Sequence, residues 1–124
     1  MTALLAQVAI VIQLVGGQAT TLVSNSGLQT QQVSVALHFG HIEEQADHAK
    51  YVVLEREVQA LVAPADFVLQ PGDRQTIRVK LRESVPRGTT LRLVTTFTPV
   101  ADANATPAAH LVQVTRFIAK AIVE

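Results

Sequence analysis

Apolar and polar residues alternate with a period of two in several short runs along the chain. In the clearest run, Ile77, Val79 and Leu81 interleave with Arg78 and Lys80. Alternation of this kind predicts a strand that has one face in the core and the other in water. Similar runs, each bounded by turn-forming residues, predict strands over residues 8–14, 19–23, 33–39, 77–82, 91–98 and 111–123.

Turn-forming residues separate these runs. Gly16 and Gly17 end the first run, and the Asn-Ser-Gly sequence at residues 25–27 is a turn signal because asparagine and glycine tolerate positive φ. Pro99 ends the run that precedes it, because proline cannot donate a ladder hydrogen bond. Strands at this spacing predict an all-β fold, an immunoglobulin-like β-sandwich of about seven strands.

Residues 43–62 fit two patterns. Their Glu, Gln, Ala and Lys content favours a helix. Four side chains also fall near helical spacing, namely Tyr51, Leu54, Val58 and Leu61. A strand over residues 51–62 is equally compatible with the pattern. We expect a polar loop followed by a strand, because a closed sandwich leaves no apolar face for a helix to cover.

The composition limits the protein to a few classes. The chain has 124 residues, with ten Lys and Arg balanced by ten Asp and Glu, and no cysteine. Neither a repeat nor a long linker divides it, so we expect one domain over residues 1–124. The lack of cysteine excludes disulfides, thiolate zinc sites and cysteine nucleophiles. Balanced charge without a basic tract argues against nucleic acid as a partner.

Charge is unevenly distributed along the chain. Every Asp, Glu, Lys and Arg lies at or after Glu43, so the first 42 residues must be largely buried or partnered. Residues 3–15 lack the basic segment that precedes a signal-peptide core. Gln7, Gln13 and the following glycines also keep the stretch short of the roughly 20 apolar residues of a membrane span. We therefore expect a strand of the mature domain.

Candidate catalytic and metal-binding residues are few. Four side chains could supply metal ligands, namely His38, His41, Glu44 and His48, but their spacing is equally that of a solvated loop. Asp66 and Asp73 flank a short predicted strand, where aspartate commonly caps backbone amides. No nucleotide-binding or nucleophile motif occurs in the sequence. We therefore expect no enzyme activity, no metal and no cofactor.

Three basic residues lie on strand faces predicted to be wet. Arg92, Arg116 and Lys120 fall on strands that are neighbours in an immunoglobulin-type sandwich. Such residues usually only make a face soluble. One or two cations with flanking amides can also capture the carboxylate of a chain terminus.

The sequence of residues 64–79 is Pro-Ala-Asp-Phe-Val-Leu-Gln-Pro-Gly-Asp-Arg-Gln-Thr-Ile-Arg-Val. It resembles the signature of the periplasmic pilus-assembly chaperones (PapD-like), whose first domain shows Pro, an apolar pair, Leu-x-Pro-Gly and Gln-x-Ile/Val-Arg-Val. Residues 14–18 and 25–27 resemble two turns of that domain, and residues 111–123 fall where its long final strand runs. The resemblance covers nearly the whole chain, and residues 64–79 are its specific part.

The resemblance implies a fold, a partner and a location. In the family, two immunoglobulin-like domains form a boomerang, and the last strand of the first domain lends alternating apolar side chains to a pilus subunit that lacks its own final strand. Strand addition shields a groove that would otherwise aggregate. A basic pair anchors the subunit's C-terminal carboxylate. The resemblance therefore implies a periplasmic protein with a pilus or fibre subunit, and an outer-membrane usher, as partners.

The match to the family's functional residues is partial. Lys120 sits where the family has its final-strand lysine, so Lys120 and Arg116 are the predicted carboxylate anchor. The family's first-strand arginine has no counterpart, and Val11 or a neighbour takes its place. The predicted donor strand comprises Leu111, Val112, Gln113, Val114 and Thr115. If Lys120 occupies the position of the family's lysine, Leu111, Gln113 and Thr115 point outward toward the subunit. A one-residue shift of the strand would present Val112 and Val114 to the subunit instead.

An alternative function remains open. The missing arginine and the missing second domain favour a structural or adhesive module that self-associates through edge strands as a homodimer or polymer. The uncharged N-terminal strand would then pair with another copy. A hydrolase or metalloenzyme is a third class. Fold resemblance alone is a weak guide to function.

Overall fold

The computed structural model describes residues 11–100 and 113–124 of the chain. This part contains nine strands, and none of its residues forms a helix that could cross a membrane. In chain order the strands are β1 (Val11–Leu14), β2 (Gln18–Ser24), β3 (Gln31–Glu44), β4 (Lys50–Glu57), β5 (Ala60–Ala63), β6 (Asp66–Leu69), β7 (Arg74–Leu81), β8 (Thr90–Pro99) and β9 (Thr115–Val123).

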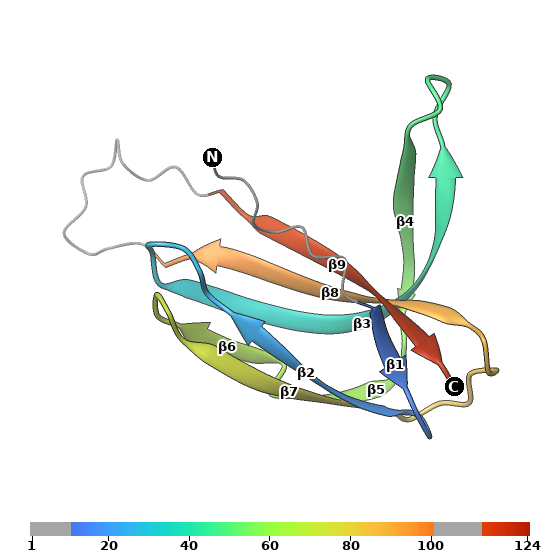
Figure 1. Ribbon diagram of the computed structural model, residues 1–124, viewed down its shortest axis with the longest axis horizontal. Helices are drawn as coiled ribbons and strands as arrows, with labels where there is room; N and C mark the ends of the chain where they lie inside the picture. The colour runs from blue at the N-terminus through green and yellow to red at the C-terminus, as the bar shows by residue number, and fades with distance from the viewer. Residues whose placement is uncertain (1–10, 101–112) are drawn as a thin grey trace.

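The strands form two sheets that pack as a sandwich (Figure 1). The larger sheet has the order β1-β9-β8-β3-β4, with β6 also paired to β3, and the smaller sheet has the order β2-β7-β5. β1 runs parallel to β9, whereas the other pairs are antiparallel. The predicted all-β, immunoglobulin-like sandwich is confirmed.

The core lies between the two sheets and is built from the alternating positions. The predicted inward residues of β7 and β8 are buried there, including Ile77, Val79, Leu91 and Leu93. Leu14 of β1 is fully buried in the same cluster. Alternation identified these strands because each has one face in the core and the other away from it.

The two predicted turns are present, but one of them is built differently from the expectation. Gly16 and Gly17 have φ angles of 64° and 77°, which is the conformation that favours glycine. Asn25 does not have a positive φ. Instead, its buried amide donates to the carbonyls of Gln29 (2.8 Å) and Leu69 (2.9 Å), and its Oδ1 accepts from the backbone N–H of Gly27 (3.0 Å). The turn at residues 25–27 is therefore stabilised by the hydrogen bonds of the Asn25 side chain rather than by a positive φ at Asn25.

The segment 43–62 has the expected order of a polar loop and then a strand, but the loop is shorter than expected. Glu43 and Glu44 extend β3, and residues 45–49 form a short turn around His48 (φ 67°) that leads into β4. β3 and β4 form a long hairpin that stands out from the sandwich (Figure 1). The predicted second part, a strand over residues 51–62, is present as β4 and β5 with a break at Val58 and Gln59.

The predicted terminal strands are only partly described. β1 begins at Val11, and the predicted residues 8–10 lie outside the described part of the chain. The predicted final strand, residues 111–123, is shorter at its start because β9 begins at Thr115. Gln113 and Val114 precede that strand, and Leu111 and Val112 lie outside the described residues.

Candidate functional site

β9 has different neighbours along its two halves. On one side it pairs with β8 over residues 115–122. On the other side β1 pairs only with residues 120–123, beginning where Val11 lies opposite Lys120. Within the described ranges, residues 115–119 therefore have a partner strand on one side only, and we call this stretch the open edge (Figure 1). An open edge presents unpaired backbone groups to which another strand can add.

Two large apolar side chains lie on the open edge. Phe117 is 43% exposed and packs edge-on against Phe97, with the ring centroids 5.6 Å apart. Ile118, on the opposite face, is 38% exposed. The donor role of residues 111–115 stays a prediction, and Phe117 and Ile118 lie just beyond that set, where the sequence reading did not single them out. The adjacent apolar pair within the final run was the signal that could have found them.

A row of paired positions that includes basic residues crosses the sheet at the C-terminal end of the open edge. Lys120 of β9 is paired in register with Arg92 of β8, and Arg92 is paired with His38 of β3. Val11 of β1 lies on the other side of Lys120. Paired positions on neighbouring strands share a face and have Cβ atoms about 5 Å apart. The row therefore runs across four strands on the face of the sheet that is turned away from the core.

Arg92 differs from its prediction. It was expected on a wet face, but only 6% of it is exposed. The reason lies in β3, which has a register irregularity between His38 and Gly40. The stem of Arg92 lies against the β3 backbone at Gly40. A Cβ at position 40 would be only 2.9 Å from Cγ of Arg92, so any residue other than glycine would crowd the arginine. This burial depends on the bulge and cannot be deduced from strand alternation.

Arg116, the other predicted anchor residue, shares the outward face with Lys120 but is farther along β9. It pairs with Thr96 and is exposed. Four residues of strand separate Arg116 from Lys120, which corresponds to roughly 13 Å between their Cα atoms. Arg92 is thus the cation that stands directly beside Lys120. The role of Arg116 as an anchor stays a prediction.

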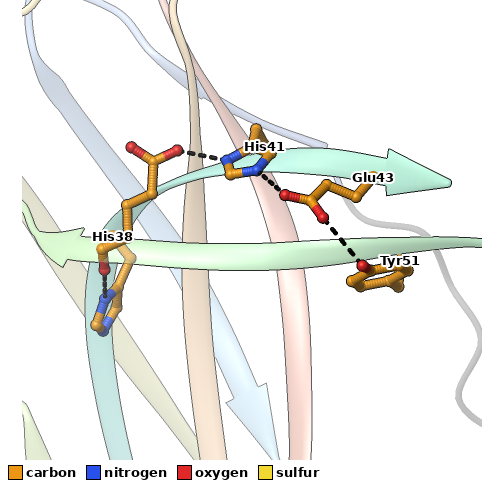
Figure 2. Close-up of polar contacts among 5 residues, drawn as sticks. His38, His41, Glu43 and Tyr51 are labelled. Atoms are coloured by element: carbon orange, nitrogen blue, oxygen red, sulfur yellow. Dashed lines mark hydrogen bonds and ion pairs between the residues drawn. The ribbon is translucent and has the colours of Figure 1, made fainter. Parts of the chain in front are cut away.

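The exposed hairpin carries a polar cluster centred on His41 (Figure 2). Nε2 of His41 is 2.7 Å from a carboxylate oxygen of Glu43, and Nδ1 is 2.6 Å from one of Glu55. A positively charged ring donates to both carboxylates. The hydroxyl of Tyr51 donates to the other oxygen of Glu43 at 3.0 Å. These contacts raise the pKa of His41 above 6.5, mainly through Glu43, and lower the pKa of Glu43 mainly through His41.

The candidate metal ligands are not brought together. His48 lies 3.3 Å from Glu44, and Nδ1 of His38 lies 3.1 Å from the backbone carbonyl of Glu55. In residues 11–100 and 113–124, no group of three or more potential ligands is placed to hold a metal ion. Asp73 behaves as the turn prediction has it, because its carboxylate accepts a bond of 3.3 Å from the backbone N–H of Gln70.

The base of the hairpin is held by Arg56. Its guanidinium donates two bonds of 2.9 Å to Glu83 and lies over the ring of Phe39, 4.5 Å from the centroid. Glu83 also accepts from the backbone N–H of Gln59 at 2.8 Å. The guanidinium, followed by this amide, lowers the pKa of Glu83 to about 2. The contact fixes the hairpin base to the segment that follows β7.

The chain has no match among protein-family models or curated protein sequences. Its fold is similar to that of solved chaperone structures. A chain of the Salmonella enterica SafA pilin–SafB chaperone complex matches all of this chain and 56% of its own length, with 20% identity and a TM-score of 0.64. The E. coli chaperone DraB matches 93% of this chain and 50% of its own length, with 15% identity and a TM-score of 0.62.

A third similar structure is the chaperone–tip adhesion subunit complex CsuC–CsuE of Acinetobacter baumannii, with 9% identity and a TM-score of 0.58. This match covers 92% of the present chain and 54% of the other. The chain thus spans about half the length of the structures it matches. At these identities the likeness establishes the fold alone, an immunoglobulin-like β-sandwich.

Proposed function

We propose that this domain binds a subunit of a pilus or surface fibre by strand addition along β9, with Lys120 receiving the C-terminal carboxylate of the added strand. The observation that carries the proposal is the open edge of residues 115–119, which ends at Lys120 where β1 begins to pair. The pilus-chaperone folds of the structural neighbours support the same function.

The charge at the end of the edge selects the direction of the added strand. A strand parallel to β9 brings its carboxyl terminus to Lys120. An antiparallel strand brings an amino terminus, whose positive charge Lys120 repels. Main-chain pairing along the open edge supplies affinity, and exposed side chains such as Phe117 and Ile118 supply selectivity. We extend the proposal to a donor role for residues 111–115, to an outer-membrane usher as second partner and to the periplasm as location.

Peptide binding tests the proposal. The probe is a synthetic peptide of about ten residues in which valine and threonine alternate, long enough for the roughly 17 Å of open edge. It is made with a free C-terminal carboxylate and as the C-terminal amide. Lys120→Ala removes a charged hydrogen bond worth roughly 1.5–3 kcal/mol, so we expect affinity for the carboxylate form to fall about 10- to 150-fold.

The matched control is Lys80→Ala, which removes an exposed lysine from β7 on the other sheet. It should leave both affinities unchanged, and Lys120→Ala should leave amide binding unchanged. Equal binding of the two peptide forms by the native protein would contradict the anchor. Dimers that grow with protein concentration, without binding of either peptide, would favour the self-associating module.

A further inference from the structure

The outward face of the smaller sheet carries a line of cations along its central strand. β7 lies between β2 and β5. Ile77 and Val79 of β7 are buried in the core, so the alternate residues of the strand point away from it. We call the basic stripe the four exposed basic residues that lie at these outward positions or directly follow the strand: Arg74, Arg78, Lys80 and Arg82.

The basic stripe has no counter-charge in the described residues, 11–100 and 113–124. No carboxylate there lies within 4.0 Å of any of its four cations. Acidic residues at its two ends have other contacts, because Asp73 accepts from the backbone N–H of Gln70 and Glu83 is paired with Arg56. The residues paired with the stripe on β2 and β5 are all uncharged: Gln18, Thr20, Ser24, Leu61 and Ala63. An anion that neutralises the stripe would therefore come from outside this part of the chain.

The stripe also polarises a chain whose total charge is balanced. The whole chain has ten basic and ten acidic residues. Residues 43–57, which form most of the β3–β4 hairpin, hold five carboxylates against Lys50 and Arg56. The hairpin and the smaller sheet lie at opposite sides of the view in Figure 1. An anionic surface therefore attracts this domain in one orientation, with the smaller sheet toward it.

Two exposed leucines flank the stripe on the same face. Leu61 of β5 is paired with Lys80, and Leu22 of β2 is paired with Thr76, so both side chains share the face of the stripe. Leu22 is 50% exposed and Leu61 is 45% exposed. Leucines beside cations are typical of surfaces that lie on membranes, because the cations meet anionic headgroups while the apolar side chains enter the boundary with the acyl chains. A soluble polyanion offers the leucines no such environment.

The spacing of the cations favours a fluid surface over a regular polymer. Alternate residues of a strand are about 7 Å apart, so the stripe spans roughly 27 Å from Arg74 to Arg82. Thr76 interrupts it and leaves roughly 14 Å between Arg74 and Arg78. A polyanion of fixed repeat matches only part of such a row. Anionic lipids diffuse within the membrane and can take the positions that the cations set.

We infer that the outward face of the smaller sheet docks on an anionic lipid membrane, with the basic stripe on the headgroups and Leu22 and Leu61 in the interface. This inference does not rest on strand addition, because β9 and its open edge belong to the larger sheet. It adds a second binding surface to the domain, on the sheet that the proposed function leaves unused.

Vesicle binding tests the inference. The probes are unilamellar vesicles of phosphatidylglycerol mixed with phosphatidylcholine, and of phosphatidylcholine alone, and the readout is the partition coefficient from co-sedimentation. We expect the native chain to bind the anionic vesicles, and to bind them less as sodium chloride screens the charges. A cation near an anionic leaflet contributes roughly fivefold to binding, so Arg78→Gln combined with Lys80→Gln should lower the partition coefficient about 25-fold.

The matched control is Lys50→Gln combined with Arg87→Gln. It removes the same total charge from exposed positions outside the smaller sheet, and it should leave the partition coefficient unchanged. An equal loss in both double variants would overturn the inference, since net charge alone would then explain binding. So would a native chain that ignores anionic vesicles or prefers soluble polyglutamate to them. Peptide binding at β9 should be the same in Arg78→Gln/Lys80→Gln as in the native chain, so each proposal can fail separately.

A tryptophan reporter tests the position of the leucines, and it remains decisive if the double variant fails to fold. The chain contains no tryptophan, so Leu61→Trp introduces a single fluorophore beside the stripe. Its emission should shift to shorter wavelength when anionic vesicles are added, because indole settles in the membrane interface. Val68→Trp is the control, since Val68 is exposed on β6 in the larger sheet, and its emission should not shift. No shift in Leu61→Trp, or the same shift in both variants, would overturn docking through this face.

Discussion

Asn25 is expected to be one of the most sensitive polar positions in the domain. Its side chain joins the β2–β3 turn to the end of β6 through hydrogen bonds to Gln29, Leu69 and Gly27. At about 1 kcal/mol net for each bond, Asn25→Ala removes roughly 3 kcal/mol from the free energy of unfolding. For a domain of this length, that corresponds to a fall of about 12 °C in Tm.

Asn25→Asp distinguishes hydrogen bonding from simple packing. The introduced carboxyl group has almost the same shape, but its charged form turns an acceptor toward the carbonyls of Gln29 and Leu69. Burial and these carbonyls raise its pKa in the folded state. The free energy of unfolding should therefore match that of the native protein most closely at low pH, and the deficit should grow as pH rises above the unfolded pKa of about 3.9.

Urea unfolding at several pH values measures both effects. Ser26→Ala is the control, because Ser26 lies in the same turn with an exposed side chain, and it should change the free energy by less than about 0.5 kcal/mol. A loss below about 1 kcal/mol in Asn25→Ala would refute the reasoning. So would a pH-independent loss in Asn25→Asp, because the buried amide would then not be the source of the stability.

Three further predictions concern charges at the surface. His41 should titrate above 6.5 by NMR, and its stabilising effect relative to His41→Gln should be complete below pH 6.5 and disappear as pH rises through the raised pKa. Arg56→Met should raise the pKa of Glu83 from about 2 toward 4.5, measured from its carboxyl carbon shift, and an unchanged value would contradict the ion pair as its cause. Val11→Arg places a further cation beside Lys120, so preference for the carboxylate peptide should increase about tenfold, and no increase in binding assays would argue against an anchor there.

The sequence predicted those parts of the fold in which one side of a strand is buried. β7 has that environment along most of its length, so polarity alternates and indicates both the strand and its inner face. β8 is buried on both faces over residues 91–94, although Leu91, Arg92 and Leu93 still alternate in polarity. The outer part of the β3–β4 hairpin has no buried side. From His41 to Glu44 every side chain is exposed, so no period of two appears in the sequence. Cross-strand polar contacts such as Glu43 with Tyr51 accompany the pairing there, and these are visible only when the two strands are in register.

The candidate site was predicted in part, for a related reason. Strand spacing is enough to place Lys120 and Arg92 on neighbouring strands and on one face. It cannot indicate that Arg92 is buried, because that depends on the bulge before Gly40, some fifty residues earlier in the chain. The end of the open edge was equally hidden, since the parallel pairing of β1 with β9 joins residues from opposite ends of the sequence.

The parallel pairing of β1 with β9 determines how far another chain can extend. β1 occupies the side of β9 from Lys120 onward, so a strand that adds at residues 115–119 meets Val11 at its lower end. The available length is about 17 Å, which gives only a few backbone hydrogen bonds. Main-chain pairing over so short a distance has little selectivity of its own. Under the proposed function, the charge of Lys120 at the point where the added strand must stop provides the register, since only a strand whose carboxylate reaches Lys120 both completes the pairing and meets a cation.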